Sequence, residues 1–341
     1  ISPPRVPRVA SSLPPAVARV RSLDWATMTD TQPRYSYLGP EGTFTWEALR
    51  MVEGAQAGEW VSVSNVGEAL DDVVSGRSHY AMIAMENSVE GGVSATQDAL
   101  AELPNLRIVG EYQVPVRFAL VGPPGTSLTA VSLIAAHPVA YAQCRHWLER
   151  ELPHHTHVPS SSNVQAATDA LDDERLHAAL APRGITDRVG VEVLADDIGD
   201  NPDAETRFVL VRRGGPVPER TGADKTSIIA ELPDDGPGRL LEMLEQFATR
   251  GVNMSLLESR PIGDAMGRYR FVIDLDGHIH DERVADALMG LRRFSPKVIF
   301  LGSYPRANGH RPEVSSRYTD EAFIEARQWL DAVAEGRPSD S

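Results

Sequence analysis

Five short polar motifs contain the side chains that could hold an anion or transfer a proton. They lie at residues 39–44, 86–92, 137–144, 160–163 and 206–208. Apolar runs typical of β-strands, at 35–38, 80–85 and 133–136, directly precede the first three. Ligands of α/β proteins bind in the loops that follow such strands. The motifs therefore predict a polar site assembled from distant parts of the chain.

The first motif, Gly39-Pro40-Glu41-Gly42-Thr43-Phe44, has two interpretations. Two glycines let a loop bring backbone N–H groups close to an anion, and a helix that starts near Thr45 adds its positive end. The alternative is a tight turn in which Thr43 or Thr45 caps that helix. The segment alone favours the turn.

The second and third motifs offer neutral polar groups. Asn87 and Ser88 place donors and acceptors at a strand end, and a simple polar turn is an equal alternative. His137 could act as an acid or base, although a histidine before proline also suits a turn or a cap. Cys144 has no evident histidine–acid partners, so we expect a small buried apolar residue rather than a nucleophile.

The fourth and fifth motifs suit a carboxylate. Serines at 160–162 precede an expected helix at 164–171, where hydroxyls and helix N–H groups converge, although capping alone would explain them. Thr206-Arg207-Phe208 enters an expected strand. An arginine there could bind a carboxylate through two parallel hydrogen bonds. The neighbouring threonine hydroxyl could donate a proton to a leaving group. The sequence has no Walker-type loop, Cys-x-x-Cys pair or dinucleotide fingerprint, so we expect neither a metal nor a cofactor.

Composition narrows the class of protein. The 341 residues suffice for two or three compact units, and a formal net charge of -15 argues against nucleic acid as a partner. The single cysteine rules out a disulfide within the chain and favours a reducing cytoplasm. No apolar run approaches the roughly 20 residues needed to cross a bilayer. We expect translation to start at Met28, with residues 1–27 as upstream sequence or a disordered tail.

Strand-like and helix-like segments alternate around the motifs. Further strands are expected at 116–121 and 208–211, and helices at 46–53, 66–75, 140–151, 164–171 and 176–181. This alternation predicts an α/β fold with mostly parallel sheet.

A stretch rich in Gly and Pro, residues 214–224, predicts a linker. The chain beyond it predicts the order β-α-β-β-α-β, with strands at 225–232, 254–259, 268–276 and 297–301 and helices at 237–250 and 281–294. A turn at 263–267 joins the two middle strands. A last helix is expected at 319–334, capped by Thr319 and followed by a frayed end.

In this order, the five motifs and the unit behind them resemble the prephenate dehydratase family over residues 34–306. The C-terminal unit resembles the ACT fold, with Glu258-Ser259-Arg260-Pro261 after its second strand and Leu301-Gly302-Ser303-Tyr304-Pro305 at its end. The resemblance implies a two-lobed catalytic domain of the periplasmic-binding-protein type at 34–213, a linker at 214–224, an ACT domain at 225–305 and a tail at 306–341. Residues 1–33 would be an N-terminal extension.

The resemblance implies a reaction in which prephenate loses carbon dioxide and water and becomes phenylpyruvate, in phenylalanine biosynthesis. Aromatisation drives this reaction, so the enzyme has to hold two carboxylates and help hydroxide depart. Thr206 would donate a proton or a hydrogen bond to the departing hydroxyl, and Arg207 would clamp a carboxylate or support the loop. The other residues assigned to the substrate cleft are Thr43, Asn87, Ser88, Gln143, Ser161, Ser162 and Phe208, the last of which would pack under the site.

The resemblance further implies that phenylalanine binds the ACT domain at a subunit interface and inhibits a homodimer or homotetramer. The residues that match the effector site are Gly238, Leu240, Glu258, Ser259, Arg260 and Pro261. The chain departs from the family pattern at two places. Ala204 replaces an asparagine that is common two residues before the threonine, with Asn201 as a candidate substitute, and Arg239 replaces an alanine at the start of the ACT helix.

Two alternatives stay open. Arogenate dehydratase acts on the amino analogue of prephenate, and the sequence does not distinguish the two substrates. A non-catalytic amino-acid-sensing binding protein would also have two α/β lobes around a cleft, but it has no reason to carry Thr206-Arg207-Phe208 with the other four motifs. A fused chorismate mutase is disfavoured, because the 33 residues before Arg34 are too few and too rich in proline.

Overall fold

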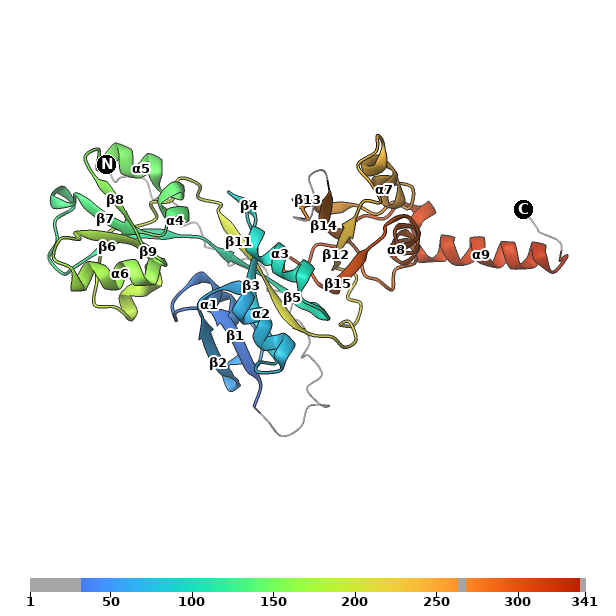
Figure 1. The fold of residues 1–341 in the computed structure, drawn as a ribbon, viewed down its shortest axis with the longest axis horizontal. Coiled ribbons are helices and arrows are strands. Elements are labelled where there is room, and N and C mark those ends of the chain that lie inside the picture. Colours follow the sequence, from blue (N-terminus) through green and yellow to red (C-terminus); the bar gives the residue numbers. More distant parts are fainter. Residues whose placement is uncertain (1–31, 263–267, 338–341) are drawn as a thin grey trace, which may run out of the picture.

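The computed structural model describes residues 32–262 and 268–337. The extension with the expected start at Met28, the expected turn at 263–267 and the last four residues lie outside the described ranges. The described chain forms three sheets arranged in a row, with a long helix beyond the third (Figure 1).

The central sheet, with its helices, is called lobe 1. Its strands are β1 (Arg34–Leu38), β2 (Glu59–Val63), β3 (Tyr80–Asn87), β4 (Gly91–Gly92), β5 (Leu106–Pro115) and β11 (Glu205–Arg213). They run in the order β2-β1-β3-β11-β5, with β4 beside β3. β1 is parallel to β2 and β3, but β11 is antiparallel to both β3 and β5. The expectation of a mostly parallel sheet is therefore wrong, because β11 returns from another part of the molecule and enters the sheet in the opposite direction.

The helices of lobe 1 include one whose two ends are both set by local chemistry. They are α1 (Phe44–Arg50), α2 (Val66–Ser75) and α3 (Ser94–Glu102), with a short 3-10 turn η2 (Ala55–Ala57). At the start of α2, the Asn65 side chain accepts from Glu68 N, and the Glu68 carboxylate accepts from Ser64 N. Gly76, at φ +78°, ends the helix in the left-handed conformation that favours glycine.

A second mixed sheet, with its helices, is called lobe 2. Its strands are β6 (Phe118–Gly122), β7 (Leu133–Ala136), β8 (Thr156–Pro159), β9 (Ala178–Pro182) and β10 (Glu192–Ala195), in the order β10-β6-β9-β7-β8. β7 is parallel to β8 and β9, and β6 is antiparallel to β9 and β10. Its helices are α4 (Pro138–Gln143), α5 (Arg145–Glu151) and α6 (Asn163–Asp172), with 3-10 turns η3 (Leu128–Ala130) and η4 (Arg183–Asp187).

Two expected helices in lobe 2 are corrected by the structure. Residues 176–181 largely form β9, because their alanines are buried between neighbouring strands, where small side chains fit whatever their helix propensity. The helix expected at 140–151 is interrupted at Cys144, whose φ of -117° breaks it into α4 and α5. The strand expected at 116–121 begins only at Phe118.

Two connections join the lobes. Val116 and Arg117 lead from β5 to β6, and residues 196–204 lead from β10 back to β11. The two connections are bonded to each other, because Val116 N donates to Ala204 O at 2.8 Å, and Ile198 N of the second connection donates to Phe118 O at the start of β6 at 2.9 Å. The expected two-lobed α/β architecture is confirmed, and Thr206 lies just beyond the second connection.

The third sheet belongs to the C-terminal unit, which has the expected ACT arrangement. Its elements in chain order are β12 (Asp224–Glu231), α7 (Arg239–Ala248), β13 (Met254–Pro261), β14 (Tyr269–Asp276), α8 (Glu282–Phe294) and β15 (Val298–Pro305). The strands are antiparallel, in the order β13-β14-β12-β15. Gly251, at φ +64°, follows α7 as expected for a residue that ends a helix.

Both faces of the two central strands of this sheet, β12 and β14, are buried. One face packs on α7 and α8 through residues such as Ile228, Phe247 and Val284. The other face joins the core of lobe 1, where Val272 and Leu301 lie in one apolar cluster with partners that include Val209. The C-terminal unit and lobe 1 therefore share one hydrophobic cluster.

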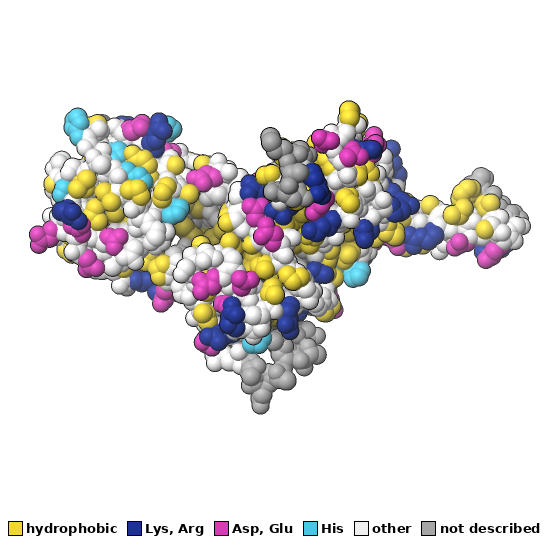
Figure 2. Space-filling view, viewed as in Figure 1, with side chains coloured by type: hydrophobic (Ala, Val, Ile, Leu, Met, Phe, Trp, Pro, Cys, Tyr) yellow, Lys and Arg dark blue, Asp and Glu magenta, His cyan; other side chains and the backbone are white. Residues whose placement is uncertain are grey.

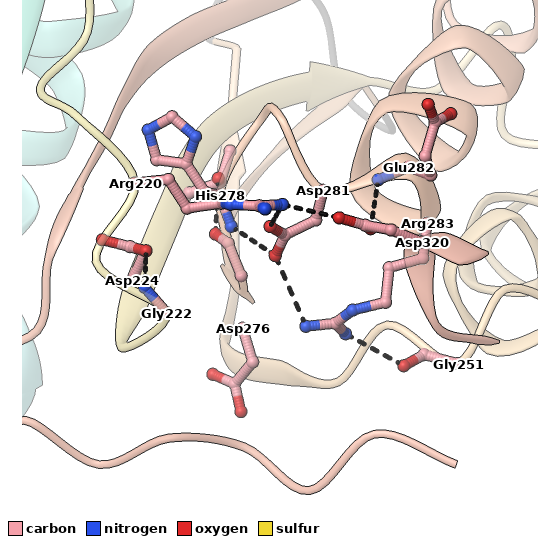
Figure 3. Close-up of polar contacts among 12 residues, drawn as sticks. Arg220, Gly222, Asp224, Gly251, Asp276, His278, Asp281, Glu282, Arg283 and Asp320 are labelled. Atoms are coloured by element: carbon pink, nitrogen blue, oxygen red, sulfur yellow. Dashed lines mark hydrogen bonds and ion pairs between the residues drawn. The ribbon is translucent and has the colours of Figure 1, made fainter. Parts of the chain in front are cut away.

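The last helix, α9 (Asp320–Ala334), follows a 3-10 turn η5 (Ser316–Tyr318) and projects from the C-terminal unit (Figure 1). Thr319 caps it as expected, since its side chain accepts from Ala322 N. Asp320 fixes its base by accepting from Glu282 N at 2.9 Å and from Arg220 Nη1 at 2.6 Å (Figure 3). Its apolar stripe is exposed, however, and apolar side chains are visible along it (Figure 2). No helix in the described ranges is both long enough and apolar enough to span a bilayer.

Candidate active site

Thr206 lies at the second position of β11, directly after the connection between the lobes. It is paired in the sheet with Asn87 at the end of β3, and only 8% of its surface is exposed. Asn87 Nδ2 donates to Thr206 Oγ1 at 3.0 Å. Two motifs that are far apart in the chain thus meet in one hydrogen bond.

The orientation of the Asn87 amide is fixed by its own turn. Its Oδ1 accepts from Val89 N at 2.8 Å and from Glu90 N at 3.3 Å. The NH2 end therefore has to face Thr206, and it occupies a lone pair of the threonine oxygen. The hydroxyl hydrogen of Thr206 is left to donate elsewhere, and accepting a hydrogen bond makes a hydroxyl a stronger donor.

Ser88 fastens the same turn to β11. Its backbone N donates to Glu205 O at 2.9 Å, and its Oγ accepts from Glu205 N at 2.9 Å. The reciprocal pair holds the turn next to Thr206. The serine hydroxyl still has its own hydrogen available for a ligand.

Lobe 2 supplies polar groups that are buried without a partner. Gln143 is 6% exposed, and neither its Nε2 nor its Oε1 has a hydrogen-bond partner. The Oγ of Ser160 is likewise buried and unpaired. Leaving such groups unpaired is costly, so each is a candidate to bind a polar ligand. The sequence predicts Gln143 but not Ser160, which the run of three serines signalled without distinguishing one from another.

The other predicted hydroxyls have local partners. Ser162 Oγ caps α6 by accepting from Gln165 N, and Ser161 is exposed. Thr43 Oγ1 donates to Leu38 O at 3.1 Å and accepts from Trp46 N at 3.3 Å. The hydrogen of Thr43 is therefore already used, and the turn interpretation of the first motif is the one that the structure favours.

The motifs of the two lobes approach one another around Gly42 and His137. A Cβ at Gly42 would lie 3.3 Å from Arg188 and 3.8 Å from Val164, at the start of α6. His137 N donates to Asn163 Oδ1 at 3.1 Å, and its ring caps α4. Burial lowers the pKa of His137, against the opposing charge of Glu90 from lobe 1. The ring is therefore mainly neutral at neutral pH.

Arg207 does not lie on the same side of β11 as Thr206. Successive side chains of a strand point to opposite faces, and the guanidinium is buried against the C-terminal unit. Its Nε donates to Glu111 at 2.7 Å, Nη2 to Tyr304 at 2.8 Å, and Nη1 pairs with Asp274 at 2.7 Å. Because protein groups already engage the donors of Arg207, the structure contradicts its expected role as a clamp on a substrate carboxylate. It favours the alternative role of Arg207 as a structural support.

The surroundings of Thr206 agree with one expectation and correct another. Phe208 is 2% exposed and packs in the core of lobe 1, which agrees with the expectation that it packs under the site. Asn201 does not substitute for the asparagine that Ala204 replaces, because its side chain accepts from Asp203 N within its own turn. The hydrogen bond to Thr206 comes from Asn87 instead. Cys144 is buried as expected, and burial together with Asp200 raises the pKa of its thiol.

Effector residues that the sequence assigns to the C-terminal unit divide between two places. Gly238, at φ +85°, and Leu240 line an open, mostly apolar pocket of about 580 Å³ at the start of α7. Tyr269 and Phe271 form its other side. Glu258 and Arg260 instead contact lobe 1, where they bond to Gly92 and Asp98.

Arg239 also lines this pocket, but its charge is satisfied locally. Its Nε donates to Asp234 at 2.9 Å, and its Nη1 donates to Glu242 at 3.0 Å. The side chain is thus held by carboxylates on its own helix and the preceding loop. The pocket keeps room for an apolar ligand.

Comparisons with known proteins agree on one family. The sequence profile described as prephenate dehydratase matches residues 35–215. The prephenate dehydratase of Mycolicibacterium vanbaalenii is 39% identical over 90% of this chain and 100% of its own length. That of Corynebacterium glutamicum is 39% identical over 91% of this chain and 99% of its own length. The crystal structure of prephenate dehydratase from Arthrobacter aurescens in complex with L-Phe is 50% identical, with a TM-score of 0.84, over 89% of this chain and 99% of that one.

Proposed function

The chain belongs to the prephenate dehydratase family, and we propose that it converts prephenate to phenylpyruvate at the site around Thr206. It is an enzyme of the lyase class, acting in the biosynthesis of phenylalanine. One C–C bond breaks to release carbon dioxide, one C–O bond breaks, and the departing hydroxide takes up a proton to leave as water. The ring becomes aromatic, so the protein has to orient the substrate and stabilise the leaving hydroxide rather than supply a driving force.

The hydrogen bond from Asn87 to Thr206 is the observation that carries this assignment. It leaves the threonine hydrogen directed away from the amide and available to the leaving hydroxyl. A neutral threonine is a weak acid, so its contribution is an oriented hydrogen bond that strengthens as negative charge develops on the leaving oxygen. Ser88 supports this geometry by fixing the turn to β11.

The carboxylates of prephenate require donors on the facing lobe. Gln143 and Ser160 are the described groups of lobe 2 that are buried and unpaired, which supports them as ligands to the substrate. Ser161 and Ser162 lie at the start of α6, where N–H groups and hydroxyls favour an anion. We assign substrate binding to these residues together with Asn87 and Ser88, and a structural role to Thr43, Arg207 and Phe208.

We propose phenylalanine as the effector, bound in the pocket at the start of α7. Its apolar wall of Leu240, Tyr269 and Phe271 suits an aromatic side chain. The related Arthrobacter structure is a complex with L-Phe. Ser259 and Pro261 lie opposite Phe271 and Tyr269 in the sheet, so they share a face with two residues that line this pocket.

We also propose a homodimer or homotetramer that works in the cytoplasm. The exposed stripe on α9 supports self-association, because Trp329 and Leu330 are each more than half exposed on a helix with no buried residue. A single, buried cysteine suits a reducing compartment. Mass measurement in solution, with and without phenylalanine, tests the assembly.

Turnover of purified protein with prephenate and with arogenate, in parallel at neutral pH, tests the activity. We expect prephenate to be consumed, with phenylpyruvate as product. Preferred turnover of arogenate would reassign the substrate while keeping the site. Turnover of neither, with phenylalanine still bound, would identify a sensor instead of an enzyme.

A further inference from the structure

The segment Glu258–Pro261 belongs to edge strand β13, so its side chains alternate between the two faces of the sheet. Ser259 and Pro261 are directly opposite Phe271 and Tyr269, and side chains of such cross-strand pairs share a face. That is the face of the effector pocket. Glu258 and Arg260 point to the other face, toward lobe 1.

Glu258 holds the loop that contains Asn87. Its Oε1 accepts from Gly92 N at 2.7 Å, and its Oε2 accepts from Gln97 Nε2. A Cβ at position 92 would meet this carboxylate and the Gln97 amide, so a larger residue there would displace the Glu258 side chain. Glu258 is thus bonded to a backbone group of β4.

Two further contacts connect β4 to the site. In the β3–β4 pairing, Gly92 is opposite Glu86 and Gly91 is opposite Asn87. Asn87 in turn donates to Thr206. A path of direct contacts therefore leads from Glu258 through β4 and the 87–91 turn to the catalytic hydroxyl.

Arg260 anchors the neighbouring helix. Its Nη2 donates to Asp98 Oδ2 at 2.7 Å, and Arg270 Nη2 donates to Asp98 Oδ1 at 3.0 Å. Asp98 lies on α3, which follows β4 directly. Glu258 therefore binds β4, and Arg260 binds the helix that follows it, α3.

We propose that Glu258 is a positioning residue for the dehydration. A ligand that binds the Ser259–Pro261 face changes the activity by altering the hydrogen bond between Glu258 and Gly92. This inference rests on the proposed function of the site. It assigns two tasks to one strand: the pocket face detects the effector, and the opposite face sets the 87–91 turn. A shift of β13 against lobe 1 moves Gly92, then Asn87, and so misdirects the Thr206 hydroxyl.

Glu258→Gln and Glu258→Ala test the proposal, with Glu245→Gln as a matched control on the exposed surface of α7. The measurements are kcat and KM for prephenate, inhibition by phenylalanine, and phenylalanine binding by calorimetry. We expect kcat of both Glu258 variants to fall by at least about five-fold, with KM within about two-fold. Phenylalanine should still bind to them but alter their rate less than in the parent protein.

Hydrogen exchange at residues 86–93 gives a readout of the loop itself, which should exchange faster in Glu258→Ala than in the control. If Glu258→Ala does not fold, Glu258→Gln, which keeps the size of the side chain, decides. Unchanged kcat, inhibition and exchange would overturn the proposal. Loss of phenylalanine binding with an unchanged kcat would also overturn it, since Glu258 would then be part of the effector site. Failure of the parent protein to turn over prephenate would instead contradict the proposed function.

Discussion

Asp274 Oδ2, on the C-terminal sheet, lies 2.7 Å from Nη1 of Arg207, the residue after Thr206. The side chains are 0% and 6% exposed, so this is a buried ion pair between the C-terminal sheet and the strand that carries Thr206. Glu111 Oε2 extends it, since it accepts from Arg207 at 2.7 Å and from Lys225 Nζ at 2.7 Å. These ion pairs therefore link the position of β11 to the position of the C-terminal sheet.

Acid should lower the free energy of unfolding by protonating Glu111, which removes its charge from this ion-pair cluster. Burial opposes its charge, but Arg207 and Lys225 outweigh burial and hold the pKa of the carboxyl below its ordinary value of 4.5. A lowered folded-state pKa stabilises the protein above 4.5 and loses that effect as pH falls through the folded value. We expect Glu111→Gln to lose about 3 kcal/mol of unfolding free energy at pH 7 and part of its pH dependence below pH 4.5. Urea unfolding from pH 7 to 3 measures both, and parallel curves for the two proteins would contradict the assignment.

Replacing Arg207 by lysine separates a structural role from a substrate clamp. Lysine keeps the charge but cannot reach Glu111, Asp274 and Tyr304 together. We expect a melting temperature lower by several degrees, corresponding to about 2 kcal/mol or more, with KM for prephenate within about two-fold. Thermal unfolding and steady-state kinetics check this. A KM raised ten-fold with unchanged stability would restore the clamp.

Removing the Thr206 hydroxyl should slow the chemical step. We expect kcat of Thr206→Ala to fall by about 100-fold, because the leaving hydroxide loses its oriented donor. Thr206→Ser keeps the hydroxyl and should retain much more activity. Thr129→Ala, on the exposed surface of lobe 2, is the control. Full activity in Thr206→Ala would remove this residue from the mechanism.

Asn87→Asp should reverse the direction of the hydrogen bond to Thr206. A carboxylate only accepts, so the threonine hydrogen would turn toward residue 87 and away from substrate. We expect kcat to fall by about ten-fold or more with a smaller change in stability. Asn65→Asp is the matched control, since Asn65 acts as an acceptor that caps α2 and aspartate caps equally well. Equal kinetics of the two variants would show that Asn87 does not orient the hydroxyl.

Because the Gln143 amide has no protein partner, replacing it should weaken substrate binding without lowering the stability of the protein. Gln143→Leu removes two buried groups that have no protein partner, so the free energy of unfolding should stay the same or rise. KM for prephenate should increase by about ten-fold, since a bond to substrate is lost. Gln165→Leu, on the exposed part of α6, serves as control. A destabilised protein with an unchanged KM would mean that Gln143 has a structural task only.

Local chemistry made much of the fold predictable. The strands around 35–38 and 80–85, the helix at 66–75 and the whole β-α-β-β-α-β order of the C-terminal unit follow from apolar periodicity and capping residues. For β9 the sequence predicts a helix instead, because Ala178, Ala179 and Ala181 carry little β preference of their own. Its burial between β6 and β7 decides its state, and burial is not a local property.

The partners of the site residues were harder to predict. Thr206 and Asn87 are separated by 119 positions and are joined only because β11 returns antiparallel beside β3. The directions of Arg207 and Glu258 depend on which neighbour covers each face of their strands. A charged residue inside an apolar strand, such as Glu111 or Asp274, is a signal of a buried pair, but the sequence does not name its partner.

By itself, the sequence determined the family, the two-lobed α/β class, the ACT unit and the motif residues, because these depend on residue types in order along the chain. The tertiary structure alone decided which groups each motif residue contacts. It directed Thr206 to Asn87 and Arg207 to the C-terminal sheet, and it divided Glu258–Pro261 between the face of the α7 pocket and the face that contacts lobe 1. The physical reason is that a strand presents alternate side chains to opposite faces, and the identity of the layer behind each face is set only when the sheets pack.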